Sequence, residues 1–122
     1  MLQAKFGDND DSYRQLASLV KTSFNKRFWN ENTGCLYDVV DEDDDTIRPN
    51  QIYAVSLPFT MPDMEREKAI VDTVMDKLYV GCGLRSLDPD HKDYHPIYIG
   101  SLSKRDHAYH QGTAWGFLLG GF

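Results

Sequence analysis

Two short segments of the sequence combine side chains that suit a sugar. Residues 105–115 supply a guanidinium, a carboxylate, two imidazoles, a phenol, an amide and an indole within eleven positions. Planar polar groups hydrogen-bond to sugar hydroxyls, and aromatic faces pack against the apolar C–H surface of a sugar ring. Residues 47–52 likewise place polar groups ahead of an apolar stretch, so we expect a site for a polyhydroxylated ligand. The candidate binding residues are Arg48, Asn50, Gln51, Arg105, Asp106, Tyr109, His110, Gln111 and Trp115.

Hydrophobic spacing predicts the helices that must position these residues. Apolar residues three and four positions apart predict two amphipathic helices, and two shorter helices are predicted to be apolar on nearly every side. A long polar loop is expected before Arg105. The amphipathic helices are predicted over 13–29 and 63–79, the apolar helices over 49–59 and 113–119, and extended segments over 35–40 and 84–87.

The order of these helices is amphipathic, apolar, amphipathic, apolar. A helix without a polar face must be enclosed, and an amphipathic helix can shield it from water. Alternating outer and inner helices are typical of an α/α toroid, in which the residues ahead of the inner helices line a central pocket. The sequence therefore predicts an all-α fold with two helical hairpins and short extended segments. Because the chain ends on the apolar residues 118–122, we expect residues 1–122 to be a slice of a larger domain, truncated at both ends.

Composition restricts the class of partner. The chain has 122 residues, and its 41% hydrophobic and 26% charged residues are ordinary for one small soluble domain. The net charge of −6 repels phosphate backbones and anionic lipids, so neither nucleic acid nor a membrane is an expected partner. Residues 1–5 lack the apolar core of a secretion signal, and we expect a cytoplasmic protein. Cys35 and Cys82 are too few for a disulfide framework and are expected to be buried free thiols.

Metal and cofactor chemistry find no support in the sequence. All four histidines follow residue 90, but no Cys or Glu completes a recognised zinc spacing with them. The acidic run 41–45 alternates as a calcium loop does, yet the sixth position holds Thr46 rather than Gly and the twelfth holds Ile52 rather than Glu. Phosphate-binding glycine loops and a nucleophile elbow do not occur. We predict no metal and no cofactor.

Four blocks of sequence resemble the glucosidase domain of glycogen debranching enzymes. They occur in the family's order and are Phe28–Asp41, Ile47–Phe59, Gly83–Leu87 and Arg105–Trp115. The resemblance implies an (α/α)6 toroid of the glucoamylase-like, six-hairpin glycosidase kind. It also implies hydrolysis of the α-1,6-linked glucose left at a trimmed branch point, with glycogen or a branched α-glucan oligosaccharide as the ligand.

The same resemblance implies that the proton-transfer residues lie outside this chain. In that family the proposed acid is an Asp in a Thr-Trp-Met-Asp segment and the proposed base is a Glu in a Ser-Glu-Ile-Phe-Asp-Gly segment, and neither occurs here. Inverting hydrolysis needs both carboxyl groups, roughly 6.5 to 9.5 Å apart. No catalytic residue is therefore expected in the chain, which would be inactive alone. Gly116 and Phe117 stand where the family usually has Pro-Trp, and Gly120 and Gly121 stand where it has Gly-Pro.

Several of the candidate residues have a structural alternative to sugar contact. In place of sugar contact by Arg48, Asn50 and Gln51, these residues would cap a helix and tie the buried Arg48 guanidinium to a carboxylate. Asp106 contacts sugar, or it pairs with Arg105 or Arg48. Trp115 stacks on a sugar ring, or it packs in the core.

A second function stays open for the whole chain. A non-catalytic glucan-binding or assembly module would keep the pocket wall and lack the chemistry. An acid–base pair of Asp38 and Asp106 is disfavoured, since nothing in the sequence separates their pKa values. We also expect the isolated chain to self-associate, because its inner helices would expose apolar faces.

Overall fold

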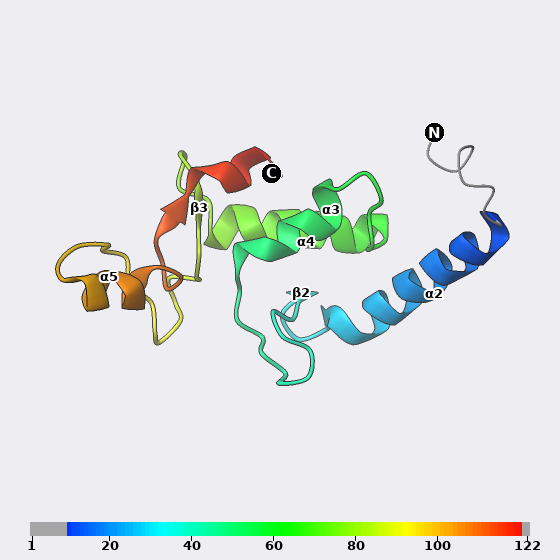
Figure 1. The fold of residues 1–122 in the computed structure, drawn as a ribbon, viewed down its shortest axis with the longest axis horizontal. Helices are drawn as coiled ribbons and strands as arrows, with labels where there is room; N and C mark the ends of the chain where they lie inside the picture. The colour runs from blue at the N-terminus through cyan, green and yellow to red at the C-terminus, as the bar shows by residue number, and fades with distance from the viewer. Residues whose placement is uncertain (1–9, 121–122) are drawn as a thin grey trace.

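The computed structural model describes residues 10–120, which form a mostly helical chain with two small sheets (Figure 1). The segment 1–5 and the last two residues, on which expectations were based above, lie outside this range. The elements are α2 (Asp10–Phe28), β1 (Trp29–Asn30), β2 (Cys35–Leu36), η1 (Pro49–Ile52), α3 (Tyr53–Ser56), α4 (Met64–Lys77), β3 (Leu84–Arg85), α5 (Leu102–Ala108), β4 (Ala114–Trp115) and η2 (Gly116–Gly120), where η denotes a 3-10 helix.

Helix α4 lies at the centre of the core and confirms the second amphipathic helix. It begins after Asp63, whose side chain accepts a hydrogen bond from the backbone N–H of Arg66. The buried stripe comprises Ile70, Val74 and Leu78, one turn apart, whereas Met75 on the same helix is 50% exposed. The packed core consists of Leu36, Ile70, Val74, Leu78, Leu84 and Leu118.

Helix α2 confirms the first amphipathic helix but extends away from the other elements (Figure 1). Only its last turns reach the core, where Phe24 and Phe28 stack at 4.7 Å between ring centroids. The earlier part of its apolar stripe is exposed, including Leu16 at 59% and Val20 at 45%. The sequence correctly predicts this helix, but most of its stripe is not covered by residues 10–120.

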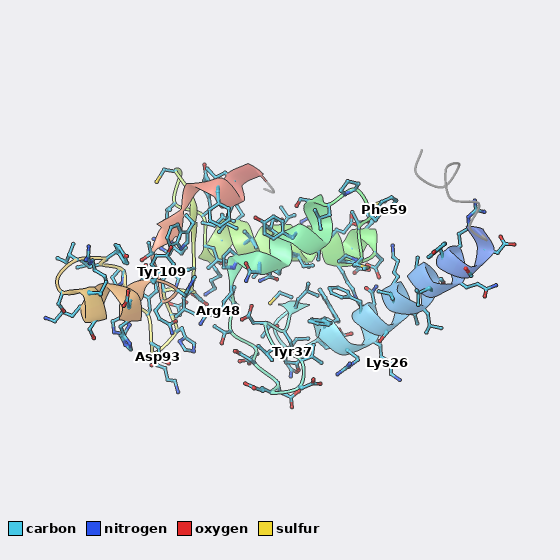
Figure 2. The ribbon with its side chains drawn as sticks, in the orientation of Figure 1. Lys26, Tyr37, Arg48, Phe59, Asp93 and Tyr109 are labelled. Atoms are coloured by element: carbon cyan, nitrogen blue, oxygen red, sulfur yellow. The ribbon has the colours of Figure 1, made fainter. Side chains whose placement is uncertain are left out.

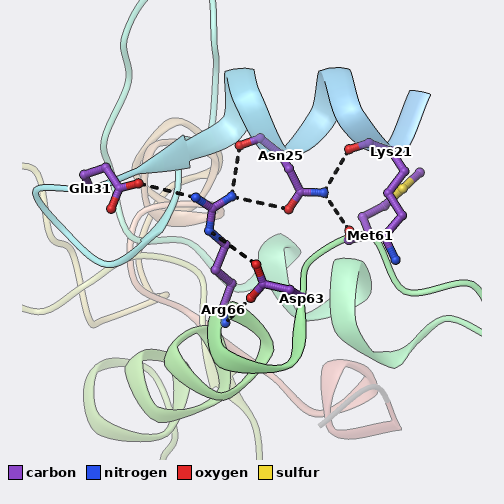
Figure 3. Close-up of polar contacts among 6 residues, drawn as sticks. All are labelled: Lys21, Asn25, Glu31, Met61, Asp63 and Arg66. Carbon is purple, nitrogen blue, oxygen red and sulfur yellow. Dashed lines mark hydrogen bonds and ion pairs between the residues drawn. The ribbon is translucent and has the colours of Figure 1, made fainter. Parts of the chain in front are cut away.

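A polar cluster joins the end of α2 to the start of α4 (Figure 3). The guanidinium of Arg66 donates to the backbone oxygen of Asn25 at 3.2 Å and to Glu31 at 3.3 Å, and it lies 4.7 Å from the centroid of the Trp29 ring. The side-chain amide of Asn25 donates in turn to the backbone oxygen of Met61 at 2.7 Å. These contacts set the angle at which α2 leaves the core.

A tight turn follows α2 and folds the chain into the first sheet. Strands β1 and β2 pair antiparallel, with Trp29 opposite Leu36 and Asn30 opposite Cys35. Gly34 adopts a φ of 67°, in the left-handed region that suits glycine. The extended segment predicted to begin at Cys35 is confirmed, although the strand ends at Leu36.

The first predicted apolar helix is shorter and less buried than expected. It consists of η1 and α3, and it ends at Ser56 because Pro58 disfavours the helical conformation of Leu57, which is extended at a ψ of 153°. Phe59 is 89% exposed. The expectation of a helix enclosed over its whole length to residue 59 is wrong.

The prediction of a second apolar helix over 113–119 is also wrong. Residues 114–115 form strand β4, which pairs antiparallel with β3, and a 3-10 helix follows. Gly83 permits this pairing, because a Cβ at that position would lie 2.9 Å from the backbone of Trp115. Conversely, helix α5 occupies part of the expected polar loop. Its residues 102–108 carry too few apolar side chains for a periodic signal.

The two cysteines differ in exposure. Cys35 is a buried free thiol as expected, but Cys82 is exposed because it lies in the turn that joins α4 to β3. Among the described helices, none is long and apolar enough to cross a membrane.

Candidate functional site

A cavity of about 510 Å³ lies where the two candidate segments meet, a size within the range of small-molecule sites. Figure 2 labels Arg48 and Tyr109, which lie on this part of the molecule, and both residues line the cavity. Its walls come from the connection between β2 and η1, from η1 itself, and from the chain around α5, β4 and η2. The lining residues are Asp38, Asp44, Arg48, Pro49, Asn50, Ser86, Tyr109, His110, Trp115, Phe117 and Leu118.

Arg48 is the residue that ties these walls together. Its Nη1 donates to the backbone oxygens of Ser86 at 3.0 Å and His110 at 2.6 Å. Its Nη2 donates to Oε1 of Gln111 at 3.2 Å, and its Nε lies 3.5 Å from Oδ2 of Asp38. Four groups from three chain segments therefore meet at one guanidinium, which leaves few of its five N–H donors for a ligand.

Gln51 supports the same residue from behind. Its Nε2 donates to the backbone oxygen of Arg48 at 3.1 Å, and its Oε1 accepts from the backbone N–H of Leu36 at 3.4 Å. Gln51 is buried beside a smaller cavity of about 130 Å³ and does not line the larger one. Gln51 and Gln111 thus contact the same arginine from two sides, and both hold the framework of the site.

The chain that follows α5 is fastened to β3. The backbone N–H of Gly112 donates to Oγ of Ser86 at 2.9 Å, and the backbone N–H of Ser86 donates to the oxygen of Thr113 at 3.0 Å. Together with the β3–β4 pairing, these bonds fix Tyr109, His110 and Trp115 against the cavity.

Aromatic rings form one side of the cavity. Tyr109 meets Trp115 at 4.8 Å and His110 at 4.7 Å between ring centroids, both with edge-on geometry. Phe117 lies 6.3 Å from Trp115 and is largely exposed. Trp115 is partly buried, so its ring both packs on its neighbours and borders the cavity. Such a surface suits the C–H face of a sugar.

Arg105 and Asp106 do not reach this cavity. Both lie within α5 and are exposed, whereas Tyr109 and His110 follow the end of that helix. Among residues 10–120, no ion pair joins Asp106 to Arg105 or to Arg48, whose carboxylate partner is Asp38. The sequence gave no signal for helix α5, and therefore no basis for predicting that these two side chains are exposed.

The cavity contains two carboxylates that were not candidate binding residues. Asp44 is engaged locally, because its Oδ1 accepts from the backbone N–H of Thr46 at 2.9 Å and from the Thr46 hydroxyl. These hydrogen bonds lower the pKa of Asp44. Burial raises the pKa of Asp38, and the nearby Arg48 partly offsets that rise. No periodic signal in the sequence marks Asp38, because strand β2 ends at Leu36 and both of its residues are buried.

The site has the groups for binding a neutral polyhydroxylated ligand. Amide, imidazole and carboxylate groups lie beside aromatic faces in one cavity. Within the part of the chain that the structure describes, no three His, Cys, Asp or Glu side chains converge in a way that could hold a metal ion.

Comparison with known proteins gives the family. A search of the curated proteins finds no match to this chain. The profile of the amylo-alpha-1,6-glucosidase family matches residues 1–122, in agreement with the resemblance of the four sequence blocks to the glucosidase domain of glycogen debranching enzymes. The chain therefore belongs to the amylo-alpha-1,6-glucosidase family.

Proposed function

We propose that this chain forms part of the wall of a glucose pocket in a glycogen-debranching α-1,6-glucosidase. The observation that carries this proposal is the shared cavity of Arg48, Asn50, Tyr109, His110 and Trp115, which come from segments about sixty residues apart in the sequence. The substrate would be the α-1,6-linked glucose of glycogen or of another branched α-glucan.

The side chains divide into binding and supporting roles. Asn50 is exposed at the cavity, and neither its amide nor the His110 ring has a polar partner among the described residues, so both can bond to hydroxyls. The Tyr109 and Trp115 rings would pack against the C–H face of the sugar. Arg48 would act mainly through the groups that it holds in place.

The proton-transfer pair is proposed to lie outside these 122 residues. Hydrolysis with inversion needs an acid and a base flanking the scissile bond. The chain by itself would then bind glucan without hydrolysing it. We further propose that it contributes helices to an (α/α)6 toroid as a slice of that domain, which fits the uncovered stripe on α2. Because its glucan substrate is a storage polysaccharide, we place the protein in the cytoplasm.

Calorimetric titration of the 122-residue chain with panose, a trisaccharide with one α-1,6 bond, tests the binding role. Trp115→Ala should weaken binding about tenfold or more, the scale on which stacked aromatic residues contribute to recognition. Phe59→Ala is the matched control, since Phe59 is an exposed aromatic residue that does not line this cavity. An equal loss in both variants, or no binding by the unmodified chain, would refute the proposal.

A non-catalytic glucan-binding or assembly module remains a second candidate, favoured by the absence of the two proton-transfer segments from the sequence. Sequencing the gene on both sides separates the two functions. Flanking Asp and Glu segments of the family type would support the enzyme, and their absence would support the module.

A further inference from the structure

The two carboxylates of the cavity differ in what already occupies their oxygens. Asp44 accepts two hydrogen bonds from Thr46 on one oxygen. Asp38 faces only the Nε of Arg48, at 3.5 Å from Oδ2, and no other donor among the described residues reaches its carboxylate. Asp38 therefore keeps most of its acceptor capacity for a ligand.

Asp38 is also held in a poorly solvated position. Its side chain is 24% exposed, and it lines both the larger cavity and the smaller one beside it. A carboxylate with little water around it gains from hydroxyl donors, because hydrogen bonds to an ionised acceptor are short and about twice as strong as neutral ones. Arg48 holds the Asp38 carboxylate in its orientation, because the Arg48 guanidinium is itself fixed by hydrogen bonds to three other groups.

The charges of the cavity disfavour an anionic ligand. Two carboxylates, from Asp38 and Asp44, outweigh the one guanidinium among the lining residues. Phosphate binding by arginine requires free N–H donors, and those of Arg48 bond to Ser86, His110 and Gln111. A phosphorylated sugar would therefore meet a net negative charge and few free N–H donors.

From these contacts we propose that Asp38 is a specificity-determining residue, which accepts hydrogen bonds from sugar hydroxyls in this cavity and selects neutral over phosphorylated glucosyl units. The inference rests on the proposed glucose site and adds to it a residue and a substrate class. It assigns no proton transfer to Asp38.

Calorimetric titration with panose and with glucose 6-phosphate tests the selectivity. Asp38→Asn should weaken panose binding about tenfold, the scale of a hydrogen bond to a charged group, and should narrow the preference for panose over glucose 6-phosphate. The matched control is Asp41→Asn, which removes a mostly exposed carboxylate from the same connection, where it pairs with Arg27. The melting temperature and circular dichroism spectrum of each variant report whether its fold is retained.

Deoxy sugars separate direct contact from an effect through Arg48. Methyl α-glucoside and its 2-, 3-, 4- and 6-deoxy analogues are titrated into the unmodified chain and into Asp38→Asn. If Asp38 accepts from a hydroxyl, removal of that hydroxyl should cost little further affinity in the variant, so the two losses are not additive. Fully additive losses for every analogue would overturn the inference. If the unmodified chain bound no sugar at all, the proposed function would be refuted. If Asp38→Asn kept the same preference for panose over glucose 6-phosphate, this inference alone would be refuted.

Discussion

Helices α2 and α4 have the same kind of sequence and different surroundings. Both are amphipathic, but the stripe of α4 is covered by β2, β3 and η2, whereas Leu16 and Val20 on α2 are exposed. Hydrophobic spacing thus predicts that a helix forms and which side seeks cover, but it does not say which segment provides the cover. On α2, the stripe lines a groove with Phe59 and Met61 that other chain segments or another molecule would have to fill.

The largest contrast between the two helices should appear in stability. Ile70→Ala removes a fully buried side chain from α4 and should lower the free energy of unfolding by about 2 to 5 kcal/mol. Leu16→Ala, on the exposed stripe of α2, should change it by less than about 0.5 kcal/mol. Denaturant unfolding measures both. Equal losses would show that the stripe of α2 is covered in solution.

A change in the β3–β4 pairing, which helps to cover α4, should have the next largest effect on stability. Gly83→Ala places a methyl group 2.9 Å from the backbone of Trp115, so β4 must move away from β3. We expect a loss of about 1 to 3 kcal/mol, the scale of overpacking. The control is Cys82→Ala, which changes an exposed position of the same turn. Gly81 is unsuitable as a control because its φ of 80° would strain any other residue. Thermal unfolding measures the effect, and equal melting temperatures for Gly83→Ala and Cys82→Ala would contradict the expectation.

The uncovered stripe should also govern self-association, which we propose for the isolated chain. Leu16→Glu places a charge on the exposed stripe and should weaken association about tenfold, equivalent to about 1.4 kcal/mol. Analytical ultracentrifugation over a range of concentrations measures it. Gln15→Glu, one position away on the same helix, is the control for added charge. A chain that stays monomeric at high concentration would refute the proposal.

The smallest effect concerns pH. Hydrogen bonds with Thr46 lower the pKa of Asp44 in the folded protein. The ionised Asp44 therefore stabilises the fold above the pKa that this residue has in the unfolded chain, and the stabilisation is lost as pH falls through its pKa in the folded protein. Asp44→Asn should therefore cost stability at neutral pH, by no more than about 1 kcal/mol because the group is largely solvated. The difference from the unmodified chain should disappear in acid. A difference that persists below both pKa values would assign it to packing.

The sequence predicts elements whose signals are local. The apolar spacing that predicts α2 and α4 lies within each helix, and both helices form within a few residues of their predicted bounds. The apolar run after Thr113 carries no periodicity that separates strand from helix, and pairing with β3 decides its conformation.

The same distinction holds for the site. Arg48 and Trp115 were candidates from residue type alone, and the cavity brings them together. Arg105 and Asp106 were candidates on the same grounds, yet they face solvent because the unpredicted helix α5 directs them there. Asp38 was not a candidate ligand because the role proposed for it depends on a contact with Arg48, ten residues further along the chain.

The central claim is that this cavity holds a glucosyl unit, and intermolecular nuclear Overhauser effects test it most directly. With panose bound to the 122-residue chain, we expect contacts from sugar C–H protons to the rings of Trp115 and Tyr109, and none to Trp29. Contacts confined to residues outside the cavity, or a bound sugar with no contact to either ring, would contradict the account.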